Sequence, residues 1–138
     1  MDLENRKHIG EIGEAIAAKY LKQKNYKILE KNFSQRYAQG PQIGEVDLVA
    51  RSKSGFLENL GIGKNPITFV EVKTVYGNKG FFPESKVNAQ KKEKIAKMAE
   101  IWLQKKKVGL DTPWQIDVIA IVIDPKEKKA KINHFRNI

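Results

Sequence analysis

Charged residues interrupt two short apolar segments of the chain, and their spacing could support metal-dependent chemistry. Asp47 lies in the segment 44–50, and Glu71 and Lys73 lie in the segment 69–74. Both segments have the β-branched, apolar composition that is typical of buried strands. A lone buried carboxylate is costly unless it is paired or binds a metal. The three charges therefore predict a shared site, and a metal-dependent active site explains all of them.

The alternation of side chains along a strand predicts which oxygens could hold the metal. Glu71 and Lys73 share one face of their strand, and Glu45 and Asp47 share one face of the preceding strand. If these faces coincide, opposed Cβ atoms lie about 4.5–5.5 Å apart, a span that one divalent cation can bridge. Asp47 and Glu71 are the expected ligands, together with the main-chain carbonyl of Val72. Because the chain has no cysteine, oxygen ligands are expected, and these favour Mg2+ or Mn2+.

Two charged residues on expected helices extend this site. Glu14 lies at the margin of the apolar stripe of the helix predicted over 8–24, from which it could reach the metal or its water. Lys91 interrupts the apolar stripe of the helix predicted over 84–107, where it could meet a scissile phosphate. Lys73 could orient the attacking water or stabilise the charge that develops on the phosphate. This set of residues predicts hydrolysis of a phosphodiester bond.

Each of these charges also has a purely structural interpretation. Asp47 or Glu71 could form an ordinary salt bridge with Lys73 at a strand end. Glu14 and Lys91 could be amphipathic side chains at the edges of their apolar stripes. Four charges in two neighbouring strands favour the shared site over the salt bridge.

The overall charge of the chain indicates a polyanionic partner. Its 26 Lys and Arg residues against 16 Asp and Glu give a formal net charge of +10, so nucleic acid, above all DNA, is the expected partner. The expected phosphate contacts are Arg36, Tyr37, Lys53, Lys64, Lys79, Lys91, Lys92, Lys94 and Lys97. We expect no membrane association and a cytoplasmic location, because no 18-residue apolar stretch and no secretory signal are present.

The remaining sequence predicts the elements that position these residues. Hydrophobic periodicity and turn residues predict a helix, three strands, a second helix and two further strands. Their expected ranges are 8–24, 26–33, 44–51, 67–74, 84–107, 114–123 and 129–135, with a turn over 34–43 and a loop over 52–66. This order predicts one α/β domain over residues 1–138, with a mixed five-stranded sheet flanked by helices.

Three further polar residues need an interpretation. Asp117 interrupts the apolar run 114–123, where it could hold Lys91 or Lys73 in place or simply begin the strand. His8 and His134 have no partner at a metal-ligand spacing, so we expect them at the surface.

The charged residues also resemble a known motif. Asp47 followed by Glu71-Val72-Lys73 is similar to the signature of the PD-(D/E)xK nuclease superfamily. A longer resemblance, to the YraN-type family (UPF0102) of uncharacterised bacterial proteins related to archaeal Holliday junction resolvases, covers most of the chain. It runs through Gly13-Glu14, Ala17, Tyr20-Leu21, 44–50, 69–74, Val87, Lys91, Ile95 and 116–120. The resemblance implies a restriction-endonuclease-like core with Glu14, Asp47, Glu71 and Lys73 as the catalytic set, and it makes a homodimer reasonable.

These observations predict a divalent-metal-dependent endonuclease that uses water as the nucleophile and prefers branched or distorted DNA. Two alternatives stay open. The chain could be a nucleic-acid-binding module that keeps the fold but hydrolyses little or nothing. It could also be a structural protein whose basic face docks on an acidic partner.

Overall fold

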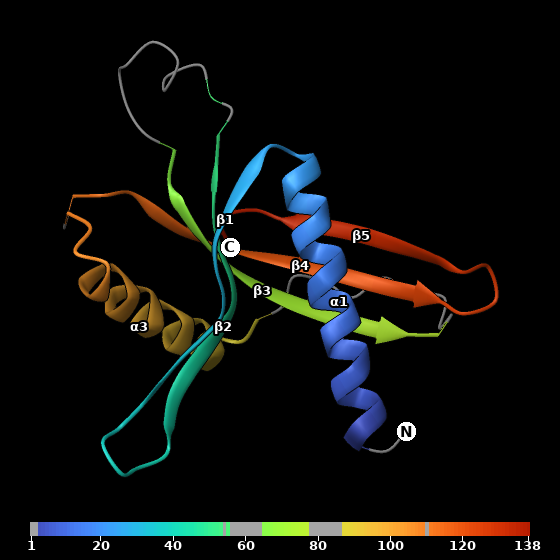
Figure 1. Ribbon diagram of the computed structural model, residues 1–138, viewed down its shortest axis with the longest axis horizontal. Helices are drawn as coiled ribbons and strands as arrows, with labels where there is room; N and C mark the ends of the chain where they lie inside the picture. Colours follow the sequence, from blue (N-terminus) through green and yellow to red (C-terminus); the bar gives the residue numbers. More distant parts are fainter. Residues whose placement is uncertain (1–2, 54, 56–64, 78–86, 110) are drawn as a thin grey trace.

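In the part of the chain that the structure describes, two helices and five strands follow one another in the predicted order (Figure 1). The computed structural model describes residues 3–53, 55, 65–77, 87–109 and 111–138. The elements are α1 (Leu3–Gln23), β1 (Tyr26–Arg36), β2 (Gln42–Ser52), β3 (Ile67–Tyr76), α3 (Ala89–Lys105), β4 (Trp114–Asp124) and β5 (Lys129–Phe135). Within this described part, neither α1 nor α3 is long and apolar enough to cross a bilayer. The order of these elements and their single five-stranded sheet confirm the predicted α/β class.

The first three elements differ from their predicted ranges mainly at their ends. Helix α1 begins at Leu3, before the predicted start at residue 8, because its polar first turns carry no apolar periodicity. Strands β1 and β2 extend into the predicted turn 34–43, which shrinks to 37–41. There the Tyr37 N–H donates to the Pro41 carbonyl over 3.2 Å, and the Gly40 N–H donates to the Tyr37 carbonyl over 3.0 Å.

The second helix is defined at its amino end by a side-chain cap. Oδ1 of Asn88 accepts a 2.8 Å hydrogen bond from the Lys91 N–H, and this satisfies one of the main-chain donors that a helix leaves free at its start. The described helix α3 then runs from Ala89 to Lys105. The first residues of the predicted helix, 84–86, lie outside the described residues.

The strands form one mixed sheet in the order β1-β2-β3-β4-β5. Strands β3 and β4 are parallel, because α3 crosses over between them, and the other neighbouring pairs are antiparallel. Strands β1 and β5 are the two edges of the sheet.

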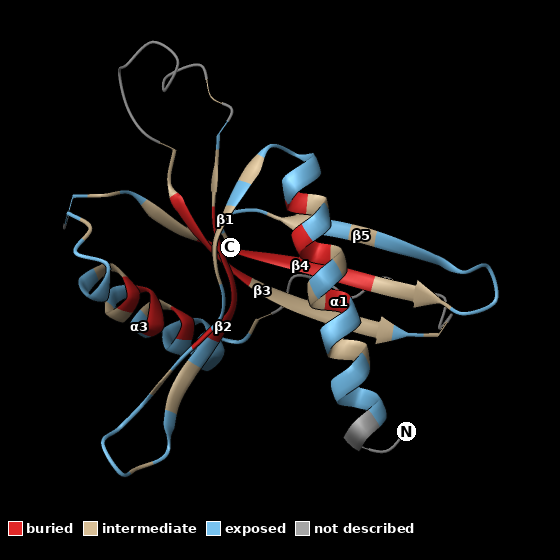
Figure 2. Ribbon diagram, in the orientation of Figure 1, coloured by how far each residue is buried: buried red, intermediate tan, exposed pale blue. Residues whose placement is uncertain are grey.

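The two helices cover opposite faces of the sheet, and each face has its own apolar core (Figure 2). Adjacent residues of β3 show the alternation: Phe69 packs with Met98 and Trp102 on the α3 side, whereas Val70 packs with Ala17 and Leu21 on the α1 side. In Figure 2 the buried residues concentrate where the strands cross between the helices.

The sheet forks between β2 and β3. These strands pair only from Leu48 opposite Val70 to Arg51 opposite Ile67. Beyond that point residues 42–46 of β2 stay paired with β1, and residues 71–76 of β3 stay paired with β4. The two strand pairs diverge in Figure 1. The fork opens at Asp47 and Glu71, the two residues that the sequence places in a shared site.

Candidate functional site

At the fork, the side chain of Asp47 takes the place of the main-chain partner that β2 would offer to β3. If the antiparallel register continued, Val72 would face Val46 of β2. Instead, Oδ2 of Asp47 accepts a 2.7 Å hydrogen bond from the Val72 N–H. Asp47 as a whole residue is only 8% exposed. A buried N–H needs a partner, so this bond holds Asp47 between the two diverging strands.

Glu14 is brought to the fork by a close approach of α1 to β3. A Cβ atom on Gly13 would lie 1.8 Å from Oγ1 of Thr74, so only glycine permits this contact. The next residue, Glu14, shares a side-chain hydrogen bond with Asp47 and a second one with Asn32 of β1. Glu14 therefore approaches the fork from the α1 side, as the sequence predicts from its place at the margin of the apolar stripe.

Burial and nearby negative charges disfavour the ionised forms of Glu14 and Asp47. Burial raises the pKa of Glu14 to about 7, and the charges of Asp47 and Glu45 add to this shift. Burial also raises the pKa of Asp47, although the hydrogen bond from Val72 acts in the opposite direction. The hydrogen bond between the two carboxyl groups raises the pKa of Glu14 and lowers that of Asp47.

Glu71, on β3, interacts electrostatically with Asp47. Burial raises its pKa to about 7, and the charge of Asp47 contributes. Two lysines act in the opposite direction: Nζ of Lys91 lies 3.5 Å from Oε1 of Glu71, and Lys73 lowers the pKa of Glu71 through its charge. Lys91 comes from α3, so Glu14 and Lys91 reach the fork from opposite faces of the sheet.

The structure thus brings the five predicted site residues into one interacting group. In the described part of the chain, however, no group of three or more His, Asp or Glu side chains is arranged to hold a metal ion. The oxygens that suit a hard cation are the carboxylates of Asp47 and Glu71 and the carbonyl of Val72. Glu14 joins them through its hydrogen bond to Asp47.

The prediction that Asp117 serves Lys91 or Lys73 is wrong. Asp117 is fully buried and accepts hydrogen bonds from the side chain of Gln115 over 2.8 Å and the main-chain N–H of Asn137 over 2.9 Å. Its other oxygen lies 2.7 Å from Nε2 of His134. Strand alternation explains the error, because Asp117 lies on the α1 face of β4 and Lys91 approaches from the α3 face.

The prediction that His134 lies at the surface is also wrong, whereas His8 is exposed as expected. The His134 side chain is 5% exposed. Its Nδ1 lies 3.1 Å from the hydroxyl of Tyr20 on α1, so His134 links α1 to β4 and β5. The residues that contact His134 are distant in sequence, and no local signal identifies them.

The predicted phosphate contacts separate into distinct regions. Arg36 and Tyr37 lie at the tip of the β1–β2 hairpin, where Nζ of Lys97 lies 3.4 Å from the Tyr37 hydroxyl and 5.8 Å from its ring centroid. Lys92 and Lys94 are exposed on α3. Lys64 and Lys79 lie outside the described residues.

Comparison with known proteins identifies the family. The model of the uncharacterised protein family UPF0102 matches residues 13–121. The chain belongs to the UPF0102 family. A UPF0102 protein of Caldanaerobacter subterraneus is 37% identical over 134 residues, which cover 96% of this chain and 95% of the relative. A UPF0102 protein of Geotalea uraniireducens is 40% identical over 121 residues, or 88% and 81% of the two chains, and one of Clostridium botulinum is 34% identical over 131 residues, or 95% and 93%.

The UPF0102 match covers the whole candidate site. It begins at Gly13, the residue that brings α1 onto β3, and it ends at Ile121 within β4. Every residue of the carboxylate and lysine group therefore lies within the matched residues 13–121, whereas His134 on β5 lies beyond them.

Proposed function

We propose that this UPF0102 protein is a divalent-metal-dependent endonuclease with a restriction-endonuclease-like core that hydrolyses phosphodiester bonds in branched or distorted DNA. One observation carries the proposal. Glu14, Asp47 and Glu71 come from three different elements and meet at the fork, burial disfavours the charged form of each, and the charge of Asp47 adds to this effect on Glu14 and Glu71. A divalent cation would remove this repulsion, because it would be the largest charge in the site.

The donor atoms fit Mg2+ or Mn2+. Both ions prefer carboxylate and carbonyl oxygens, and Mg2+ needs only one or two carboxylates because it keeps several waters. Asp47, Glu71 and the carbonyl of Val72 would hold the ion, and Glu14 would support it through Asp47. A bound divalent cation supplies positive charge and lowers the pKa of an attacking water.

The two lysines have separate roles in this proposal. Lys73 follows Glu71 on the same face of β3, where its ammonium group can orient the attacking water or stabilise charge on the phosphate. Lys91 is 45% exposed and is bonded to Glu71 through a 3.5 Å contact. With Glu71 engaged as a metal ligand, the Lys91 ammonium would be available for the scissile phosphate.

A nucleic-acid-binding module without hydrolysis is the second candidate, and a specific observation favours it. Lys91 already supplies a positive charge to Glu71, and the described residues hold no ready three-residue ligand group. A net charge of +10 would support DNA binding in either case.

A cleavage assay separates the two candidates. Purified protein is incubated with fluorescent linear duplex and four-way-junction DNA in Mg2+, Mn2+ or EDTA. We expect the parent to cleave only with a metal, and Lys73→Ala and Asp47→Asn to lose about 100-fold or more in rate. Lys129→Ala and Asp124→Asn, at the distant β4–β5 hairpin, serve as matched controls. Metal-independent binding with no cleavage by the parent would establish the binding module instead.

A further inference from the structure

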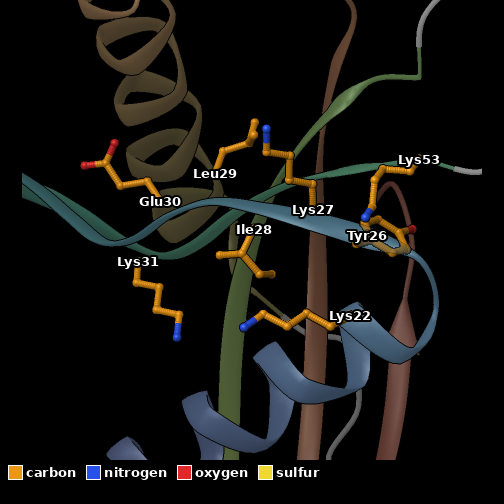
Figure 3. Close-up of a pocket in the computed structure, with 8 residues that line it drawn as sticks. All are labelled: Lys22, Tyr26, Lys27, Ile28, Leu29, Glu30, Lys31 and Lys53. Carbon is orange, nitrogen blue, oxygen red and sulfur yellow. The ribbon is translucent and has the colours of Figure 1, made fainter.

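A lysine-rich hollow lies along the free edge of β1 (Figure 3). It has a volume of about 490 Å³, and four lysines line it: Lys22 of α1, Lys27 and Lys31 of β1, and Lys53 directly after β2. In Figure 3 the side chains of Lys22 and Lys31 lie on the same side of β1 as Ile28, and Lys27 projects to the other side. The edge therefore presents ammonium groups on both of its sides.

A β-bulge creates this arrangement. The register of β1 on β2 passes from Ile28 opposite Ala50 to Glu30 opposite Val49, so Leu29 is the extra residue. Because of this extra residue, Lys31 lies opposite Leu48, which packs on the α1 side together with Ala50. In an unbroken strand Lys31 would lie on the face opposite to Ile28. The bulge thus turns Lys31 toward α1 and also disrupts the main-chain edge that a peptide strand would need for pairing.

The positive charge of the hollow is not neutralised by its own lining. Glu30 is the one acidic residue among the described lining residues, and its Oε1 accepts a 3.0 Å hydrogen bond from Nε1 of Trp102 and lies 3.2 Å from Nζ of Lys106. Within the described chain, none of the four lysines forms an ion pair with a carboxylate. The surface is suited to a polyanion, because phosphate contacts from lysine supply most of the affinity in nonspecific nucleic-acid binding.

Lys31 connects this hollow to the candidate active site. The same residue lines a neighbouring hollow of about 200 Å³ together with Glu14 and Asn32. Glu14 is hydrogen-bonded to both Asp47 and Asn32. Lys31 is therefore shared by the two hollows and lies between the other lysines of the β1 edge and Glu14. From Lys27 to Lys31 the strand spans about 13 Å, which is about the axial rise of three to four base pairs of duplex DNA at about 3.4 Å each.

We propose that the β1 edge is a phosphate-backbone track that leads a nucleic-acid strand to the fork, with Lys31 as the contact nearest to the carboxylates. This inference rests on the proposed function, because it assumes that the substrate is a nucleic acid. The track extends the predicted contact at Lys53 to Lys22, Lys27 and Lys31, which the sequence analysis did not single out.

Salt-dependent binding tests the track against a variant with equal charge loss. In the track variant Lys22, Lys27, Lys31 and Lys53 are all changed to glutamine. In the control variant the lysines at the opposite end of the sheet are changed in the same way, at Lys126, Lys128, Lys129 and Lys131. The affinity for a fluorescent four-way-junction DNA is measured by anisotropy in EDTA at several KCl concentrations.

We expect the slope of log K against log[KCl] to become less negative by about 0.9 for each phosphate that a lysine no longer neutralises. The track variant should show this change for at least two phosphates and should bind about tenfold or more weakly, whereas the control variant should keep a slope close to that of the parent. Equal changes in both variants would show a general charge effect and would overturn the track.

Single cysteines then locate the DNA. Since the chain has no cysteine, Lys31→Cys and Lys128→Cys can each carry one photo-crosslinker. We expect DNA crosslinks from position 31 and not from position 128. If the parent binds and cleaves DNA but position 31 gives no crosslink, the track is wrong and the nuclease proposal stands. If the parent binds no nucleic acid, the proposed function fails as well.

Discussion

The main-chain N–H of Val72 is hydrogen-bonded to the carboxylate of Asp47 over 2.7 Å, at the point where β2 and β3 stop pairing. The side chain of Asp47 thereby replaces the main-chain partner that Val72 would have in a continuous sheet. The charge of the same carboxylate raises the pKa of Glu14 and the pKa of Glu71. The residue that opens the sheet is also the centre of the candidate site.

Two substitutions of Asp47 separate its structural part from its charge. Both Asp47→Asn and Asp47→Ala remove the negative charge, but only the amide of asparagine can still accept the hydrogen bond from Val72. We expect Asp47→Ala to be less stable than Asp47→Asn by about 1–3 kcal/mol, because an unpaired buried N–H remains. Urea unfolding in EDTA measures this difference. Equal stability of the two variants would show that the hydrogen bond does not hold the fork.

Two glycines of α1 give a matched pair for the helix contact. At Gly13 a Cβ would lie 1.8 Å from Oγ1 of Thr74, whereas at Gly10 it would meet nothing within 4 Å. We expect Gly10→Ala to stabilise the protein by about 0.5–1 kcal/mol, since alanine is the better helix residue. Gly13→Ala should destabilise it by about 1–3 kcal/mol, because α1 must move away from β3.

A second substitution at the contact tests this explanation. Thr74→Ala removes the nearest atom, so the double variant Gly13→Ala/Thr74→Ala should recover part of the stability that Gly13→Ala loses. Simple additivity of the two unfolding free energies would argue against a clash at this contact.

Much of the fold could be predicted because its signals are local. The final strand, Lys129–Phe135, has its predicted bounds, and the order of the seven described elements follows from periodicity and turn residues. Asp47, Glu71 and Lys73 could be singled out because charge within an apolar strand is conspicuous in the sequence alone.

The features that the sequence could not reveal depend on strand register. The fork requires pairing to end after Leu48 and Val70, and the bulge at Leu29 decides which face carries Lys31. Asp117 and His134 illustrate the same limit, since each is interpreted wrongly until β4 and β5 are paired. These properties arise between strands, and the periodicity of one segment contains no information about them.

Asp117 should contribute to stability and not to metal binding. Asp117→Ala leaves His134, Gln115 and the Asn137 N–H without their acceptor, and we expect a loss of about 3 kcal/mol in the free energy of unfolding. The affinity for Mn2+, measured by calorimetry on the folded protein, should not change, because Asp117 is bonded to Gln115, His134 and Asn137 and is absent from the carboxylate group. A weaker Mn2+ affinity without loss of stability would reverse this assignment.

The raised pKa of Glu71 predicts how stability depends on pH. Burial raises this pKa from an ordinary value of 4.5 to about 7, so between these values the native state binds more protons than the unfolded state. Its contribution is therefore complete below pH 4.5 and is lost as the pH rises through about 7. In EDTA, the difference in unfolding free energy between the parent and Glu71→Gln should shift by on the order of 2 kcal/mol against the parent across this range. The exposed Glu127→Gln variant, whose difference from the parent should stay flat, is the control. A difference between the parent and Glu71→Gln that does not depend on pH would contradict the burial of this charge. Mg2+ should restore the stability of the parent at pH 8, because an ion that binds only the native state stabilises it.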